Sequence, residues 1–298
     1  MKQRTQASLK LLFAMVAISF VITLAKKSLA EVPFYTFVWL QMVFAIVAML
    51  IYLLFVRKES LFVSIKPKVW LILIGIGLLN YCAVRFFFIF SLDLLPVTTH
   101  AYLMNFVGIV TMFLSVILLK EKPKLLQILG ALIAVVGLWV FFYEKPKGGE
   151  LIGIISVSFA VICLALTNIL IRNLQLAKQH GLSHHQIATL SVCIGGVPLI
   201  ILGLVIDFPV NPISNQDWLV IILNGVIANA LAMTVFSQVM QYLKAYEASI
   251  IAMSGIIFTA LFAMPLLNDY LNQLELLGIA FMIVGIGLVQ YQYRRLTN

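Results

Sequence analysis

The chain has 298 residues, of which 63% are hydrophobic and 10% are charged, and its mean hydropathy is +1.09. So few polar residues cannot cover the surface of a soluble globule of this length. The composition therefore excludes a soluble protein and predicts a membrane protein. The net charge of +9 does not indicate a nucleic-acid partner, because the cations lie beside apolar runs rather than on a basic face interleaved with aromatic residues.

Apolar runs of about 20 residues, the length that crosses a bilayer core, recur along the chain between short polar breaks. The first run follows a short basic head, residues 1–10, and lacks a small-residue cleavage site, so we expect a retained helix rather than a signal peptide. Helices are predicted near residues 9–30, 33–56, 69–94, 97–119, 124–143, 151–174, 186–206, 217–242, 246–267 and 273–292. The pattern therefore predicts an all-α membrane protein with ten transmembrane helices.

The polar breaks between these spans alternate in charge. With the basic head in the cytoplasm, fifteen of the twenty lysines and arginines fall on the cytoplasmic side and four on the other, while Arg85 lies within a span. This asymmetry follows the positive-inside rule and predicts that both termini are cytoplasmic. Because a miscounted helix would scramble the alternation, the charges support an even number of spans independently of hydropathy.

The pattern of residues 70–137 returns in residues 218–285 at a constant shift of 148 positions. The matched pairs are Trp70 and Trp218, Gly77 and Gly225, Glu121 and Asp269, Gly130 and Gly278, and Gly137 and Gly285. We interpret the two stretches as copies of one unit, with units at residues 1–146 and 147–298. Each copy holds five predicted spans, an odd number, so the second unit enters the membrane from the opposite face. Such inverted repeats are a recurrent plan of secondary transporters, with the substrate site near the midplane.

Each unit also contains a Leu-Leu pair, an acid two residues later and a glycine nine residues after the acid. These are Leu118-Leu119-Lys120-Glu121 with Gly130, and Leu266-Leu267-Asn268-Asp269 with Gly278. The paired pattern resembles the signature of the drug/metabolite transporter (DMT) superfamily, EamA type, over roughly residues 8–292. The resemblance implies a ten-helix transporter whose central cavity is lined chiefly by spans 1, 3, 4, 6, 8 and 9.

The sequence departs from this family pattern at three positions. A proline is usual inside spans 4 and 9, but Val107 and Gly255 stand there, and Gln41 stands where an arginine is usual in span 2. These changes leave open whether the helices break at those points.

Polar residues within the spans are the best indication of a site, because each costs free energy in hydrocarbon and tends to face the bundle or a wet cavity. The predicted substrate-binding residues are Ser19, Lys26, Asn80, Tyr81, Arg85, Tyr102, Asn105, Asn168, Asn229 and Ser254. For any single residue the alternative is a hydrogen bond that merely joins two helices, worth on the order of 1 kcal/mol. For the set as a whole we favour a cavity.

Arg85 lies one turn beyond Tyr81 on the same helical face. Either it reaches the outer interface or pairs with Asp93, or it is a fixed cation that holds a substrate carboxylate or phosphate bidentately. Lys26 approaches from span 1 at a similar depth, with interfacial anchoring as its alternative. Arg172 mirrors Lys26 at the cytoplasmic end of span 6 under the inversion, with ordinary positive-inside anchoring as its alternative.

All eleven acidic residues fall at or near the ends of spans, so no carboxylate is predicted at the midplane. A carrier of hard cations, or a proton-coupled pump of lipophilic cations, would usually need one there. We therefore predict a secondary transporter that moves a small metabolite across the cytoplasmic membrane by alternating access. An amino acid or related carboxylate is the leading substrate, by export or exchange, and coupling through His100, Glu247 or a tyrosine stays open.

Two other functions remain open. One is multidrug or organic-cation efflux through an aromatic cavity built from Trp39, Tyr81, Phe86 and Tyr102. The other is a non-transporting membrane assembly or lipid-handling subunit.

We expect no enzymatic activity, cofactor or metal. His180, His184 and His185 have no acid or cysteine at ligand spacing, and the three cysteines fall in apolar runs. The expected partners are a small-molecule substrate and the lipid bilayer, without nucleic acid, and the chain is expected to be a monomer or a homodimer.

Overall fold

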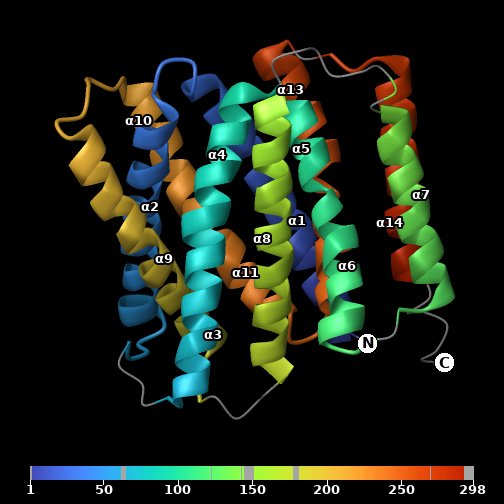
Figure 1. Ribbon diagram of the computed structural model, residues 1–298, viewed down its shortest axis with the longest axis horizontal. Coiled ribbons are helices and arrows are strands. Elements are labelled where there is room, and N and C mark those ends of the chain that lie inside the picture. Colours follow the sequence, from blue (N-terminus) through green and yellow to red (C-terminus); the bar gives the residue numbers. More distant parts are fainter. Residues whose placement is uncertain are drawn as a thin grey trace.

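The computed structural model of the chain describes residues 2–61, 65–121, 123–141, 143, 151–176, 181–268 and 270–291. Within these ranges the regular structure is helical, with no strand (Figure 1). Seven helices or runs of consecutive helices are long and apolar enough to cross a membrane, and three further apolar helices have 10–17 residues. The described part of the chain is thus an all-helical bundle of the kind the composition predicts.

The first unit begins with α1 (Lys2–Ser28) and α2 (Phe34–Ile51), and α2 continues as the π-helical η1 (Tyr52–Val56). It then forms one continuous helix from α3 (Pro67–Gly77), the π-helical η2 (Leu78–Val84) and α4 (Arg85–Leu94), followed by α5 (Val97–Met104), α6 (Phe106–Leu118) and α7 (Leu125–Phe141). Pro33, Pro67 and Pro96 stand at the starts of α2, α3 and α5, where the fixed φ and missing N–H of proline are tolerated.

The second unit repeats this order. It contains α8 (Leu151–Leu176), α9 (His184–Asp207), α10 (Asn215–Leu223), the π-helical η3 (Asn224–Leu231), α11 (Ala232–Val239), α12 (Ala245–Ala252), α13 (Gly255–Leu267) and α14 (Gln273–Tyr291). A capping box starts α9, because the Ser183 hydroxyl accepts from the Gln186 N–H while the Gln186 side chain accepts from the Ser183 N–H. Every predicted span corresponds to a helix or to a run of consecutive helices.

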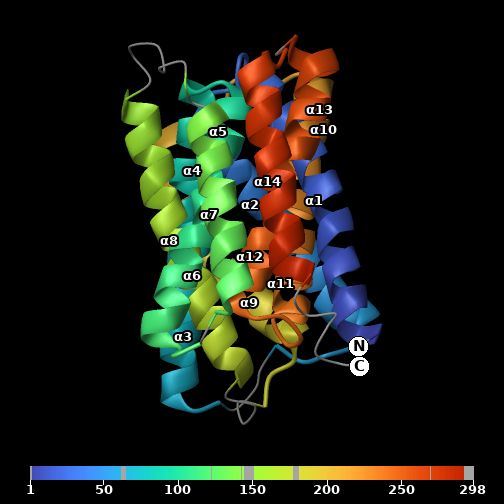
Figure 2. The same ribbon diagram turned by 90° about the vertical axis from the view of Figure 1, so that its right-hand side faces the viewer.

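The two units are related by inversion. The π-helical segments η2 and η3 follow α3 and α10 at equivalent places, and the helix breaks at Asn105 and at Met253 and Ser254 recur at the same sequence offset. In Figure 1, α1 begins at the lower end of the bundle, whereas α8 begins at the upper end. Figure 2 shows that α1 begins and α14 ends toward the same end of the bundle.

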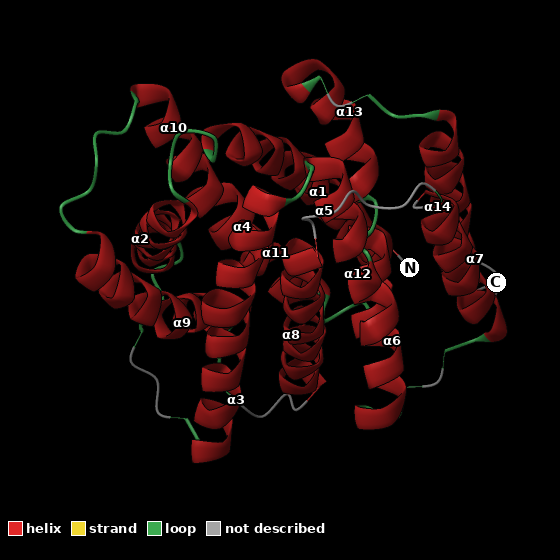
Figure 3. Cartoon of the chain, turned by 45° about the horizontal axis from the view of Figure 1, so that its top comes forward, coloured by secondary structure: helices red, strands yellow, loops and turns green. Residues whose placement is uncertain are grey.

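The repeated glycines mark where the two units meet. A Cβ on Gly137 would lie 2.6 Å from the carbonyl oxygen of Gly278, and a Cβ on Gly278 would lie 2.6 Å from that of Gly137. One on Gly285 would lie 2.5 Å from the carbonyl oxygen of Gly130. These reciprocal contacts join α7 to α14, which form a pair at one edge of the bundle (Figure 3). Close helix packing at Gly130 and Gly137 is therefore present.

Gly77 and Gly225 form a second repeat-related pair of contacts. A Cβ on Gly77 would lie 2.9 Å from Ile194 in α9, and one on Gly225 would lie 2.5 Å from the carbonyl oxygen of Gln41 in α2. Because α2 and α9 occupy equivalent places in the two units, each glycine lets its helix approach the equivalent helix of the other unit.

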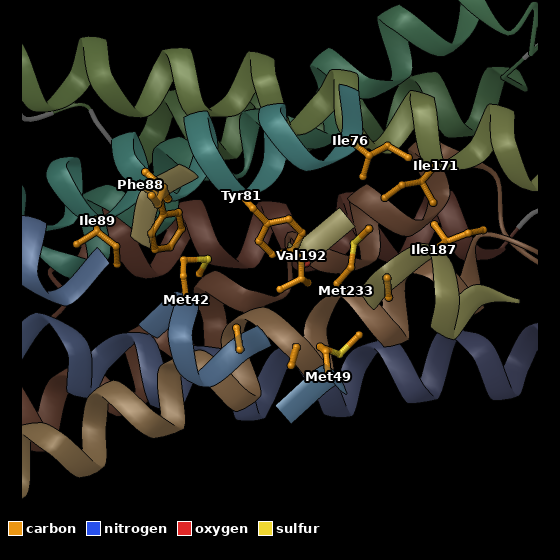
Figure 4. Close-up of a cluster of buried hydrophobic side chains, with 14 of the residues drawn as sticks. Met42, Met49, Ile76, Tyr81, Phe88, Ile89, Ile171, Ile187, Val192 and Met233 are labelled. Atoms are coloured by element: carbon orange, nitrogen blue, oxygen red, sulfur yellow. The ribbon is translucent and has the colours of Figure 1, made fainter. Parts of the chain in front are cut away.

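The main apolar core lies between α2, η2, α4, α8, α9 and α11 (Figure 4). Met42, Tyr81, Phe88 and Val192 are among its buried side chains. Large apolar side chains such as Phe13 and Phe55 are also exposed on the outside, at 71% and 74%. A bundle that is apolar both in its interior and on its outer surface is suited to a hydrocarbon environment.

Some predictions fall outside the described residues. These are the roles of Asp269 and His180, two of the four cations expected on the non-cytoplasmic side (Lys145 and Lys147), and the link that holds the boundary between the two units.

Candidate functional site

A cavity of about 170 Å³ lies between the two units. Its wall is built from α1, η2 with α4, α5 with α6, α8, η3 with α11, and α12 with α13. These elements fall in spans 1, 3, 4, 6, 8 and 9, the six that the family resemblance implies. The volume is room for on the order of ten water molecules, and the wall is mostly apolar with a few polar groups, as is usual for a small-molecule site.

Irregular backbone forms much of this wall. At Asn105 the N–H donates to the Tyr102 carbonyl at 3.1 Å, and the Gly108 N–H donates to the Asn105 carbonyl at 3.2 Å. The equivalent turn in the second unit has the Ile256 N–H donating to the Met253 carbonyl at 3.3 Å. These three-residue bonds interrupt the α-helical ladder, and such discontinuous helices often surround transporter sites.

The structure answers a question that the sequence left open, namely whether these helices break without proline. Val107 and Gly255 replace the usual prolines, yet both helices break at the repeat-equivalent places. Asn105 and the Ser254–Gly255 pair are weak helix formers, because Asn and Ser compete for backbone hydrogen bonds and Gly has a high backbone entropy. The Ser19 hydroxyl also donates to the Gly255 carbonyl at 2.9 Å, which gives this carbonyl a partner on α1.

Arg85 is the cation of the cavity. It begins α4 directly after η2, and its Nη2 donates to the Ala228 carbonyl in η3 at 2.9 Å. The guanidinium carbon lies 5.9 Å from the ring centroids of Tyr81 and Phe88, within cation–π range. Its Nε is buried without a hydrogen-bond partner. Among the described residues that line the cavity there is no carboxylate, so the cavity contains no countercharge for Arg85.

Amides and hydroxyls surround the rest of the cavity. Asn80 has a buried Oδ1 without a hydrogen-bond partner, and Asn105 has a buried Nδ2 in the same condition. Asn168 lines the cavity from the second unit and donates from Nδ2 to the Ser249 hydroxyl at 3.0 Å. Together with Ser19, these residues provide uncharged donors and acceptors around one fixed cation. The arrangement can hold a small molecule with an acidic group.

Five of the ten predicted site residues line this cavity: Ser19, Asn80, Arg85, Asn105 and Asn168. The other five are outside its lining: Lys26, Tyr81, Tyr102, Asn229 and Ser254. The contacts of Tyr102, Asn229 and Lys26 show what these three side chains bond instead.

Two of these residues join helices. Tyr102 stacks on Phe141 at 3.7 Å and donates its hydroxyl to the Gly137 carbonyl at 2.5 Å, which attaches α5 to α7. Asn229 donates from Nδ2 to Gln41 Oε1 at 3.1 Å, which attaches η3 to α2.

Tyr81 and Ser254 are buried beside the cavity without lining it, and the Tyr81 Cβ faces Gly195 of α9.

Sequence reasoning did not select four polar lining residues: His100, Thr167, Ser249 and Thr259. The repeat register held the missing signal, since the offset of 148 relates Ser249 to Ala101 and Met253 to Asn105, and all four line the cavity.

Lys26 and Arg172 lie at opposite ends of the cavity in roughly corresponding places, two positions away from the repeat offset of 148. Lys26, one turn beyond the lining residue Ile22, donates from Nζ to the carbonyls of Leu92 at 2.9 Å and Asp93 at 2.8 Å. Arg172, directly after the lining residue Ile171, donates from Nη1 to the Met240 carbonyl at 2.6 Å.

The two acceptors are themselves repeat-equivalent, because Leu92 and Met240 differ by 148 positions. Each acceptor lies at the C-terminal end of α4 or α11, where the partial negative charge of the helix favours a cation. Arg172 Nε also bonds Glu121 Oε1 at 3.2 Å. We call the Lys26 and Arg172 contacts the two end latches.

A further polar cluster lies beside the Arg172 end. Glu247 forms an ion pair with Arg4 at 2.5 Å, accepts from the Lys244 N–H at 2.9 Å and accepts from Gln127 Nε2 at 3.3 Å. These contacts join the start of α1 to α7 and α12. Glu247 does not line the cavity, and its carboxylate joins helices beside it.

In the described part of the chain, no group of three or more His, Cys, Asp or Glu residues is placed to hold a metal. The three cysteines are free thiols.

Comparison with known proteins gives a family match and a fold match. The profile described as the EamA-like transporter family matches residues 6–143 and 151–291. No curated protein matches the sequence. A solved structure described only as "Crystal structure of protein" has a TM-score of 0.76 at 16% sequence identity, covering 99% of each chain. At 16% identity, the similarity to this solved structure supports the fold alone.

Proposed function

The chain belongs to the EamA-like transporter family and is a multi-pass membrane protein, and we propose that it is a secondary carrier of a small metabolite that works by alternating access. The proposed substrate is an amino acid or a related carboxylate, moved by export or exchange across the cytoplasmic membrane. The proposed topology has ten spans, with both termini in the cytoplasm, and the chain acts as a monomer or a homodimer.

The unneutralised Arg85 carries this proposal. Removing a guanidinium from water costs several kcal/mol, which one hydrogen bond to Ala228 and two ring contacts offset only in part without a carboxylate in the cavity. A substrate carboxylate about 4 Å away would gain about 4 kcal/mol at an effective dielectric of about 20. The charge of the cavity therefore selects an acidic group on the substrate.

The apolar wall supports a substrate with a carbon skeleton. Four methionines, Met15, Met104, Met233 and Met253, line the cavity beside Phe88. Methionine is flexible and polarisable, so such a wall adapts to side chains of different shape. A small carboxylate with an apolar portion fits both the fixed cation and this wall.

The end latches support alternating access. In the proposed topology the Arg172 latch closes the cytoplasmic end, and the Lys26 latch closes the outer end. Each latch consists of two hydrogen bonds from a charged donor, worth about 1.5–3 kcal/mol apiece, a sum of the same order as the gain expected from binding a substrate carboxylate. Because the two latches bond repeat-equivalent acceptors at opposite ends of the cavity, one end can open while the other stays closed, as alternating access requires.

Organic-cation efflux, the main alternative within transporters, has weaker support. None of Trp39, Tyr81, Phe86 and Tyr102 lines the cavity, and Trp39 donates from Nε1 to Asp207 at 2.8 Å instead. Arg85 would also repel a cationic substrate. Lipid handling without transport is supported by no feature of the central cavity.

Uptake into proteoliposomes tests the proposal. Vesicles containing the purified protein are incubated with a mixed pool of metabolites, and their contents are identified by mass spectrometry, with protein-free vesicles as the control. Saturable accumulation of carboxylates supports the proposed carrier. Flux of organic cations would instead establish the efflux alternative, and no flux of any metabolite would leave the non-transporting alternative.

A further inference from the structure

A second, polar pocket of about 360 Å³ lies at the end of the bundle where α1 begins. Residues from four parts of the chain line it: Lys10 in α1, Arg57 after η1, His184 in the first turn of α9, and Gln241 after α11. It shares no lining residue with the central cavity. The proposed carrier function does not use this pocket.

The pocket is rich in hydrogen-bond donors and has a positive charge. Lys10 and Arg57 are its cations, and no acidic residue lines it. Glu59, outside the lining, forms an ion pair with Arg57 at 3.6 Å between Oε1 and Nε, and its other oxygen accepts from the Ser183 hydroxyl. The Arg57 side chain is 48% exposed. Its guanidinium therefore keeps donors for a ligand.

His185 supplies a buried group without a partner. Its side chain is 3% exposed and packs edge-on against Tyr52 at 5.2 Å between ring centroids. Its Nδ1 has no hydrogen-bond partner, although the residue lines a polar pocket. The pocket also lies at the N-terminus of α9, a 24-residue helix whose positive dipole end favours an anion.

We infer that this pocket binds a phosphate group. A phosphate presents several acceptor oxygens, which match the ammonium of Lys10, the planar guanidinium of Arg57 and the imidazole of His185. A metal ion does not fit, because no carboxylate or thiolate lines the pocket. The same chemistry would accept an anionic phospholipid headgroup or a soluble phosphate.

The surroundings of the pocket favour the lipid headgroup. Phe13 is 71% exposed and lies one turn from Lys10 on α1, while Phe55 is 74% exposed and precedes Arg57 by two residues. Apolar side chains left uncovered by protein face hydrocarbon in a membrane-spanning bundle. A basic pocket bordered by such side chains is reached by a lipid from the side, with its acyl chains along the apolar surface.

Calorimetric titration of the full-length protein in neutral detergent tests the inference without requiring transport. The probes are inorganic phosphate, and short-chain phosphatidylglycerol or phosphatidylcholine added as mixed micelles. We expect saturable binding of one phosphatidylglycerol per chain, with phosphatidylcholine weaker. Changing Lys10→Gln and Arg57→Gln together should weaken binding about a hundredfold, about tenfold for each lost charged contact.

The matched control is the pair Lys66→Gln and Lys68→Gln, which removes the same charge from exposed positions outside the pocket. Lys10→Gln alone is a second test if the double variant misfolds, because Lys10 is exposed. Phosphatidylglycerol binding that is lost in the pocket variants alone identifies a lipid headgroup, and phosphate binding lost in them without lipid binding identifies a soluble ligand. No saturable binding of either probe, equal loss in the control, or unchanged affinity in Lys10→Gln overturns the inference.

Discussion

Replacing Arg85 separates substrate recognition from folding. One of its five N–H donors is used by the Ala228 carbonyl at 2.9 Å, and its Nε has no partner. Arg85→Ala removes the only charged group among the described residues that line the cavity. The side chain has no ion pair whose partner would be left charged and buried, and the loss of one bond to Ala228 costs about 1–3 kcal/mol at most. Expression and the folded bundle should therefore persist.

The expected loss of transport is large. A carboxylate held by two donors of a guanidinium gains two charged hydrogen bonds of about 1.5–3 kcal/mol each. Losing both costs about 3–6 kcal/mol, which is about 10²-fold to 10⁴-fold in the uptake efficiency kcat/KM. Arg85→Lys keeps a point charge but not the planar pair of donors, so it should fall between Arg85→Ala and the unchanged protein.

Initial rates of carboxylate uptake into proteoliposomes, at equal protein content, measure this loss. Lys68→Ala is the control for net charge, because Lys68 is exposed at the start of α3 and outside the cavity. Unchanged uptake by Arg85→Ala would remove Arg85 from the site and, with it, the argument for an anionic substrate. An equal fall in Lys68→Ala would attribute the effect to surface charge.

Three further predictions follow from the packing and the latches. Gly278→Ala puts a Cβ 2.6 Å from the Gly137 carbonyl oxygen and should lower the free energy of unfolding in detergent by about 1–3 kcal/mol. Gly287→Ala in the same helix, where a Cβ would have no atom within 4 Å, is the control and should not lower it. Equal melting temperatures of the two variants would contradict the α7–α14 contact. Arg172→Gln and Lys26→Gln should open opposite ends of the cavity. Each is combined with Met253→Cys in a protein without native cysteines, and the rate of thiol labelling at residue 253 should rise from opposite faces of the membrane. A rise from the same face in both variants would refute the paired latches. Asn229→Ala should lower the melting temperature through the lost bond to Gln41, worth about 0.6–1.7 kcal/mol, with KM unchanged; a raised KM without loss of stability would place Asn229 in the site.

The spans and the repeat were readable from the sequence because their signals are periodic. Apolar length predicts a helix in lipid regardless of its neighbours, since unpaired backbone groups are too costly there. The glycine pairs were informative for a similar reason: Gly137 and Gly278 meet at their backbones, where any larger side chain collides. The family match covers both predicted repeats.

The site was only partly readable, because depth along a span does not say which way a side chain faces. Asn105 and Asn229 look alike in sequence, but one lines the cavity and the other bonds Gln41 between helices. The sequence left the helix breaks open because the usual prolines are absent, whereas Asn105 and Ser254 break the ladder without them. Ser249 enters the cavity wall through that break, which no local pattern indicates.

The carrier account is tested most directly by counterflow. Proteoliposomes are loaded with an unlabelled carboxylate that the protein accepts, and the initial uptake of the same labelled compound is compared with uptake into unloaded vesicles. If one cavity faces the two sides alternately, internal substrate should accelerate labelled uptake, which should saturate and depend on Arg85. Uptake that rises linearly with concentration, ignores the internal substrate and survives Arg85→Ala would contradict a substrate-binding cavity that alternates between its two ends.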